Sequence, residues 1–110
     1  MQQILLTTIG RKSGKPHTVA LGAVQEGDGW VVIATYYGAD VHPSWWLNLV
    51  ANPTATIQVG DQMVKVRMQE ITNPADRERL WNTAVARMKM YANYPKKTSR
   101  VFPLGLLRPV

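Results

Sequence analysis

The chain has 110 residues, and thirteen lysines and arginines against seven aspartates and glutamates give it a formal net charge of +6. This length suits a single domain over residues 1–110, and the absence of cysteine excludes disulfides and thiolate chemistry. No apolar run approaches the roughly 20 residues of a membrane span, and the first residues lack a signal-peptide pattern. We expect a cytoplasmic protein whose basic surface favours an anionic partner.

The first third of the chain is predicted to form three strands, at residues 4–9, 18–25 and 30–35. A basic turn at 10–16 joins the first two, because its glycines and its proline interrupt regular structure. In the second strand, Ala20 and Gly22 put small side chains on one face, which would let something flat approach the backbone. The glycine-rich stretch 26–29 is typical of a hairpin turn.

A short helix is predicted to begin at Pro43, since proline is tolerated in the first turn, with His42 or Asp40 as its N-cap. The Asn-Pro dipeptide that follows should end it. Trp45 and Trp46 are adjacent and would point about 100° apart on this helix, so they cannot both face one apolar layer. We expect one indole to pack in the core and the other to meet something flat.

The remaining strands are predicted at residues 54–59, 62–71 and 101–107. In the middle one, Val64 and Val66 alternate with Lys65 and Arg67, which is typical of one buried and one solvent-exposed face. A second helix should open at Pro74. Its buried stripe is predicted to be Leu80, Trp81, Ala84, Val85 and Met88. Six strands and two helices indicate a mainly β (α+β) fold, a small antiparallel barrel.

The chain offers little chemistry of its own. The turn at 10–16 lacks the glycine spacing and the following helix of a phosphate-binding P-loop. His17 and His42 are too few and too scattered for a metal site, so we predict none. The sequence contains no nucleophile elbow, and no carboxylate pair falls in a plausible pocket element. If the protein is an enzyme, we expect a cofactor to carry the chemistry.

Two basic clusters bear on the anionic partner, one formed by Arg11, Lys12 and Lys15 and the other by Lys96, Lys97 and Arg100. The first belongs to the glycine-flanked turn, where the Ser13 hydroxyl and backbone N–H groups could also hold phosphate or carboxylate oxygens. On spacing alone, an ordinary basic hairpin beside ordinary core tryptophans explains the same residues equally well.

Three segments taken together carry a family resemblance. They read L-T-T-I-G-R-K-S-G-K-P, then A-T-Y-Y-G-A-D-V-H-P-S-W-W-L-N-L-V-A-N-P, then M-Y-A-N-Y with a closing T-S-R-V-F-P. Over nearly the whole chain they resemble the deazaflavin-dependent nitroreductase family, actinobacterial oxidoreductases that use coenzyme F-420. The resemblance implies a split β-barrel related to FMN-binding proteins. The N-terminal extension usual in that family, associated with the membrane or with closing the pocket, is missing from this sequence.

The resemblance also implies which residues bind the cofactor. Arg11, Lys12 and Ser13 match the turn that grips its phosphate and acidic tail, and His17 stands where the family usually carries arginine. The other matching positions are Val19, Ala20, Leu21, Ala34, Thr35, Tyr36, Ser44, Trp45, Trp46 and Asn48.

The substrate side is implied by a spaced set of tyrosines. Tyr91 and Tyr94 match two of them, and Met88 stands in the place of a third. We take Thr35, Tyr91 and Tyr94 as the candidate catalytic residues, with Thr35 or Tyr91 hydrogen-bonding the oxygen where charge develops or relaying a proton to it. A tyrosine with an ordinary pKa near 10 is a feeble acid, which favours hydrogen bonding for Tyr91.

We therefore expect a reductase that moves a hydride from reduced coenzyme F-420 to a quinone, enone or nitroaromatic. The alternative is a carrier that sequesters F-420, FMN, haem or a lipid without turnover, and FMN is the alternative cofactor. A basic barrel that binds single-stranded nucleic acid is a third hypothesis, but we predict no nucleic-acid partner. Peripheral membrane contact and a homodimer are the remaining expectations.

Overall fold

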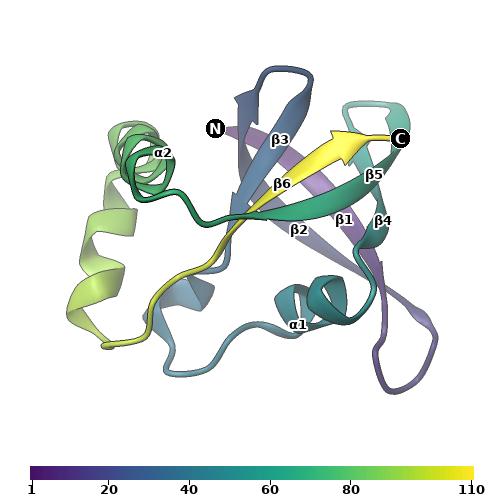
Figure 1. Cartoon of the computed structure of the whole chain (residues 1–110), viewed down its shortest axis with the longest axis horizontal. Helices are drawn as coiled ribbons and strands as arrows, with labels where there is room; N and C mark the ends of the chain where they lie inside the picture. The colour runs from purple at the N-terminus through teal and green to yellow at the C-terminus, as the bar shows by residue number, and fades with distance from the viewer.

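The computed structural model describes residues 1–110, and its centre is a closed barrel of six antiparallel strands (Figure 1). The order around the barrel is β1-β2-β3-β6-β5-β4, so each strand pairs with two others and no edge is left open. The strands are β1 Gln2–Ile9, β2 Pro16–Glu26, β3 Gly29–Ile33, β4 Thr54–Val59, β5 Gln62–Ile71 and β6 Leu104–Pro109. The expected mainly β barrel is confirmed.

Helical segments fill the longer connections outside the barrel. The two α-helices are α1 Ser44–Ala51 and α2 Pro74–Arg87, and two 3-10 segments are η1 Tyr36–Gly38 and η2 Lys89–Lys96. In Figure 1, α2 and the yellow-green η2 lie to the left of the barrel, and α1 lies below it. None of the helices is long and apolar enough to cross a bilayer. Both predicted helices are confirmed, whereas the 3-10 segments carry no periodic pattern that would predict them.

The strands β1 and β2 each begin two residues earlier than predicted, at Gln2 and Pro16. Three further predictions of where an element begins or ends are wrong. The N-cap of α1 is Pro43 itself, in an extended conformation without a side-chain cap, because the His42 ring is turned toward Arg100 instead. The third strand ends at Ile33 rather than at residue 35, since the Ala34 N–H leaves the ladder for the Pro103 carbonyl. The last strand covers 104–109 and not 101–107, because Phe102 and Pro103 give their carbonyls to partners outside the ladder.

Alternation along the strands creates two cores. Val32 and Leu107 point into the barrel, while their neighbours Val31 and Leu106 point out toward α2. The barrel core is Ile4, Leu6, Ala23, Val32, Leu49, Ala55, Ile57, Val66 and Leu107. The second core is Val24, Val31, Ile33, Leu80, Ala84, Tyr94, Phe102, Leu104 and Leu106. Sheet residues therefore support helices on the outside as well as the barrel interior.

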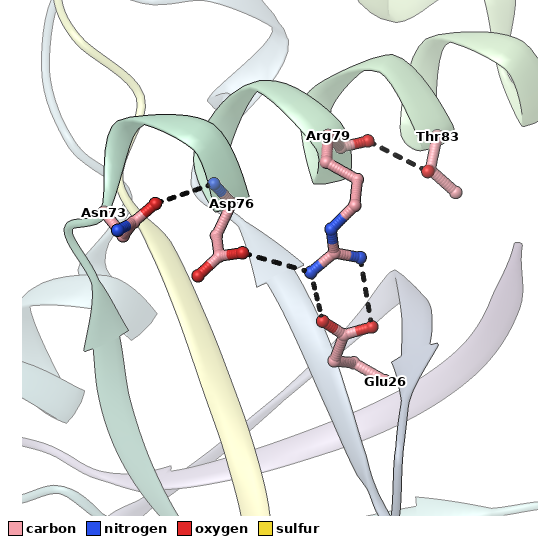
Figure 2. A network of polar contacts seen from close by, with 5 residues as sticks. All are labelled: Glu26, Asn73, Asp76, Arg79 and Thr83. Carbon is pink, nitrogen blue, oxygen red and sulfur yellow. Dashed lines mark hydrogen bonds and ion pairs between the residues drawn. The ribbon is translucent and has the colours of Figure 1, made fainter.

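The helix α2 is fastened to the end of β2 by a polar network (Figure 2). Arg79 donates to both carboxylate oxygens of Glu26, at 2.5 and 3.3 Å, and to Asp76 at 3.5 Å. The helix starts where the Asn73 side chain accepts from the Asp76 N–H at 3.1 Å, and the Thr83 hydroxyl donates to the Arg79 carbonyl. The guanidinium lowers the pKa of the Glu26 carboxyl, but the pair is exposed, so it orients the helix more than it stabilises it.

Candidate active site

A cleft of about 770 Å³ runs along β2, with the β1–β2 turn at one end and η2 at the other. Its walls come from β1, β2, β3, η1, α1 and η2, so segments far apart in the sequence meet there. Arg11 and Lys12 line it, and no aspartate or glutamate does. The cleft therefore favours an anionic ligand at its basic end.

The basic end is a tight turn whose backbone is hydrogen-bonded across itself. The Gly10 N–H donates to the Lys15 carbonyl at 2.8 Å, and the Gly14 N–H donates to the Gly10 carbonyl at 2.9 Å. Ser13 Oγ accepts from the Lys15 N–H at 3.2 Å and lies 3.3 Å from His17 Nε2. A Cβ at Gly10 would lie 2.6 Å from Ser13 Oγ, so only glycine allows this closeness.

Asn48 connects the turn to the helix α1. Its Oδ1 accepts from the Arg11 backbone N–H at 3.1 Å and from the Arg11 guanidinium at 2.9 Å, while its Nδ2 donates to Thr8 Oγ1 at 3.1 Å. Asn48 and Thr8 are buried, and no buried side-chain polar atom in the chain lacks a partner. Since buried polar groups are costly when unpaired, this arrangement fixes the turn relative to α1.

The two indoles of α1 differ as expected. Trp46 is 3% exposed and packs against β6, where a Cβ at Gly105 would lie 2.9 Å from the indole. Trp45 is only partly buried and lines the cleft. The ring planes stand at 88° to one another with centroids 6.3 Å apart. One tryptophan is thus a core residue, and the other offers an aromatic wall to a ligand.

The opposite end of the cleft is formed by tyrosines from η1 and η2. Tyr94 lies 5.3 Å from Tyr91 and 6.2 Å from Tyr37 between ring centroids, and Tyr36 lies 6.4 Å from Tyr37. Burial, and then the neighbouring phenols, raise the pKa of Tyr91, and burial and Tyr37 raise the pKa of Tyr94. Both therefore stay protonated O–H donors at neutral pH, which suits hydrogen bonding better than proton transfer.

The turn that carries Tyr36 and Tyr37 is strained. Their φ angles are 46° and 57°, in the left-handed region, which costs a residue with a side chain about 1–2 kcal/mol. Gly38 follows at φ 81°, and its N–H donates to the Thr35 carbonyl at 2.9 Å. A Cβ at Gly38 would lie 2.9 Å from the Tyr94 carbonyl. The close contact between η1 and η2 thus depends on glycine, and it sets the tyrosines side by side.

Arg100 holds this turn from behind. Its guanidinium donates to the carbonyls of Thr35 at 2.7 Å, Ala39 at 2.8 Å and Ala34 at 3.0 Å, and Nη1 lies 2.6 Å from His42 Nδ1. Burial lowers the pKa of Arg100 and contributes most to lowering that of His42. The basic-cluster interpretation of Arg100 is wrong, because its donors are occupied by backbone oxygens.

The structure brings most of the predicted site residues to this cleft. Those lining it are Arg11, Lys12, Ser13, His17, Val19, Ala20, Leu21, Thr35, Tyr36, Ser44, Trp45, Asn48, Tyr91 and Tyr94. Two predicted cofactor-binding residues do not line it: Ala34 and Trp46 are buried behind the wall. Tyr37 and Met90 also line the cleft but were not predicted, and Arg100 behind it was predicted only as part of a basic cluster. Two consecutive tyrosines at 36–37, directly after a predicted strand, were the sequence feature from which Tyr37 could have been assigned to the site.

Comparison with known proteins gives this cleft its context. The family model described as F420H2-dependent quinone reductase matches residues 1–109. This chain belongs to that family. It is 33% identical over 106 residues to an F420H2-dependent quinone reductase of Mycobacterium tuberculosis, spanning 94% of this chain and 71% of that one. A solved F420-H2 dependent reductase, FDR-A, is 36% identical with a TM-score of 0.85, over 97% of this chain and 94% of that one.

More distant structures share the fold alone. A haem storage protein of Vibrio cholerae has a TM-score of 0.73 at 16% identity, over 99% of this chain and 82% of that one. The expected split β-barrel fold is therefore confirmed. Within it, this member of the F420H2-dependent quinone reductase family is an oxidoreductase whose cofactor is coenzyme F-420.

The cleft residues fit that cofactor. Coenzyme F-420 combines a flat deazaflavin ring with a phosphate and an acidic tail. At one end the cleft offers the cationic and hydroxyl donors of Arg11, Lys12 and Ser13. Further along it offers the Trp45 indole and the face of β2 that carries the small residues Ala20 and Gly22. No carboxylate opposes the anionic part. The donor set thus matches the charge of the tail, and the walls match the shape of the ring.

Proposed function

We propose that this chain transfers a hydride from reduced coenzyme F-420, bound along β2, to a quinone bound at the tyrosine end of the cleft. The observation that supports this is the polarity of one continuous cleft, with Arg11 and Lys12 at one end and Tyr91 and Tyr94 at the other. When bound, the cofactor supplies the hydride. With one further proton, the quinone becomes a hydroquinone, so electrons and protons balance.

In this proposal the protein binds and orients. Arg11, Lys12 and Ser13 hold the phosphate and the acidic tail, with His17 beside them. Trp45 would lie against the deazaflavin ring and keep its reactive face toward the acceptor. Val19, Ala20, Leu21, Tyr36 and Ser44 complete the walls. Ala34 and Trp46 support these walls from behind.

The acceptor oxygen is where negative charge develops during hydride transfer. Thr35 and Tyr91 are placed to donate hydrogen bonds near it, and Tyr94 holds the Tyr91 ring through a packed contact. Because burial raises the pKa of Tyr91, it would act as a neutral hydrogen-bond donor and not as the source of the proton. The proton that the hydroquinone takes up from solvent is balanced by the one that F420H2 loses when it is oxidised. Enones and nitroaromatics present similar electron-poor groups and are expected as further acceptors.

The experiment is a titration of the apo-protein with coenzyme F-420, and separately with FMN, following tryptophan emission. We expect saturable quenching by F-420 that is weakened in Arg11→Ala and Lys12→Ala. Trp45→Phe should abolish most of the quenching, whereas Trp46→Phe, the matched control in the core, should keep it. Stronger quenching by FMN than by F-420 would contradict the cofactor.

Turnover is tested with reduced F-420 and a soluble quinone under anaerobic conditions, following reoxidation of the cofactor. We expect stoichiometric oxidation of the cofactor and repeated turnover. Tight F-420 binding without hydride transfer to any quinone, enone or nitroaromatic would replace the reductase by a carrier.

Two further proposals concern partners. Tyr37 and Met90 are 73% and 53% exposed at the cleft mouth, and Lys97 lies over the Tyr94 ring at 5.8 Å, a mixture that suits an anionic membrane surface. Co-sedimentation with anionic but not neutral vesicles would support that contact. A solved structure that is 36% identical to this chain is a domain-swapped dimer, which supports a homodimer here. Sedimentation velocity would decide it.

A further inference from the structure

The guanidinium of Arg100 makes an unusual set of contacts for a partly buried cation. Every hydrogen bond that it makes goes to the segment 34–42, and none goes to a carboxylate. The only ion pairs of the chain are those of Arg79. The Cζ atom of Arg100 also lies 4.8 Å from the centre of the Phe102 ring. A partly buried cation whose donors go to backbone carbonyls restrains the segment that it contacts.

We propose that Arg100 is a positioning residue for hydride transfer, which sets the turn 35–39 so that Thr35, Tyr36 and Tyr37 present the acceptor end of the cleft. Arg100 itself does not line the cleft. The inference rests on the proposed function, since the reaction gives this geometry its purpose.

The turn needs an external support because its own hydrogen bonds are few. The Gly38 N–H donates to the Thr35 carbonyl and the Ala39 N–H to the Tyr36 carbonyl, and these two bonds close the left-handed turn. The Thr35 carbonyl accepts from Arg100 as well, at 2.7 Å. Without this second donor, Tyr36 and Tyr37 can relax to ordinary φ values and turn away from the cleft.

Arginine suits this position better than lysine. Three nitrogens of one rigid plane donate to three separate carbonyls: Nε to Ala39, Nη1 to Ala34 and Nη2 to Thr35. A lysine ammonium carries the same charge but has one nitrogen, so it cannot span these oxygens. Arg100→Lys therefore separates the charge from the geometry.

His42 is the remaining contact and makes the support sensitive to acid. Its Nδ1 accepts from Arg100 Nη1 only while the imidazole is neutral, because protonation would set two cations 2.6 Å apart. Glu70 from β5 and Asp40 from the same loop are the acidic groups whose charges act on this pair, and they oppose the loss of protons. Burial and Arg100 outweigh them, so the pKa of His42 is lowered and the contact persists at neutral pH.

The test compares Arg100→Lys with Arg77→Lys as a matched control. Arg77 also donates to backbone carbonyls, those of Phe102 and Ile71, but it forms no hydrogen bond to the turn 35–39. In the apo-protein we expect the amide hydrogens of Gly38 and Ala39 to exchange with solvent about tenfold faster in Arg100→Lys than in wild type. A change of about tenfold in the opening equilibrium corresponds to the loss of one charge-assisted hydrogen bond. Arg77→Lys should leave their exchange unchanged.

With the loaded protein, Arg100→Lys should lower kcat for the quinone about tenfold while Kd for F-420 stays within about twofold of wild type. Arg77→Lys should leave both constants unchanged, even if its Tm falls. In wild type we expect kcat to decline at acidic pH, as His42 is protonated. His42→Asn keeps an acceptor oxygen but cannot be protonated, so its kcat should match wild type at neutral pH and should not show that decline.

Two outcomes would overturn the inference: unchanged kcat and amide exchange in Arg100→Lys, or losses in both variants that simply follow their Tm. A wild-type protein that binds F-420 but never turns over a quinone would instead contradict the proposed function. The amide exchange of the apo-protein tests the support of the turn without reference to turnover.

Discussion

Asn48 Oδ1 accepts two hydrogen bonds from Arg11, one from its backbone N–H and one from its guanidinium. The same amide donates to Thr8 on β1, so one buried side chain joins a strand, a turn and a helix. Because Trp45 is carried by that helix, the anion-binding end of the cleft and its aromatic wall keep a fixed spacing.

Asn48→Ala should therefore affect binding as well as folding. It leaves the Arg11 N–H without its acceptor and Thr8 without its donor, which should lower the free energy of unfolding by about 1–3 kcal/mol. We expect the Kd for coenzyme F-420 to rise about tenfold, measured by tryptophan quenching, since the guanidinium loses its anchor. Asn52→Ala, at the exposed end of the same helix, is the control and should leave Kd unchanged.

Gly38→Ala should disturb the tyrosine end of the cleft. The new Cβ would meet the Tyr94 carbonyl at 2.9 Å, in addition to the cost of φ 81°. Gly60 has φ 61° with nothing within 4 Å of a Cβ, so Gly60→Ala isolates the backbone cost of about 1–2 kcal/mol. We expect Gly38→Ala to unfold at lower urea than Gly60→Ala, and it alone should lower quinone turnover. Equal effects of both variants would argue against a crowded contact between η1 and η2.

Stability should depend on pH through His42. Its pKa in the folded chain lies below the ordinary value of about 6.5, so the unfolded chain takes up the proton first as the pH falls. The free energy of unfolding should have its full value above about pH 6.5 and should decline below that pH. Urea denaturation of wild type and His42→Asn across this range measures the effect. The variant should show a flatter pH dependence, and identical curves would contradict the assignment.

Tyr91→Phe tests the hydrogen bond to the acceptor. Ring packing against Trp81 and Tyr94 is kept, so folding and F-420 affinity should not change. We expect kcat for the quinone to fall about tenfold or more, as when one donor to a developing oxyanion is lost. If turnover of every acceptor is unchanged, Tyr91 only shapes the pocket. Tyr94→Phe keeps the same packing and provides the comparison.

The strands and helices of the fold could be predicted because their signals are local. Alternation of Val64 and Val66 with Lys65 and Arg67 gave β5, and the Asn-Pro pairs marked one helix end and one helix start. The elements that shape the tyrosine end of the cleft, η1 and η2, could not be predicted. Their left-handed and 3-10 geometry is imposed by contacts with distant residues and leaves no periodicity in the sequence.

The candidate site was accessible to sequence reasoning where a motif carried it. The turn with Arg11 and the helix with Trp45 and Asn48 matched a family pattern, but the pattern did not say which indole faces the ligand. Burial decides that for Trp45 and Trp46, since Trp46 packs against Gly105 of β6, which is distant in the sequence. The role of Arg100 was hidden for the same reason, because the backbone oxygens that it contacts lie 61, 65 and 66 residues away in the sequence.

The strand β6 closes the barrel by pairing with β3 on one side and β5 on the other. Ile33 pairs with Leu104, so this closure joins segments separated by most of the chain, and it carries a large entropic cost. During synthesis the hairpins of β1–β2 and β4–β5 can form early, but the edges of β3 and β5 stay unpaired until β6 has been made. The barrel is therefore expected to close slowly, and only after β6 has been synthesised. The unpaired edges of β3 and β5 would be the surfaces that chaperones or a second chain encounter first.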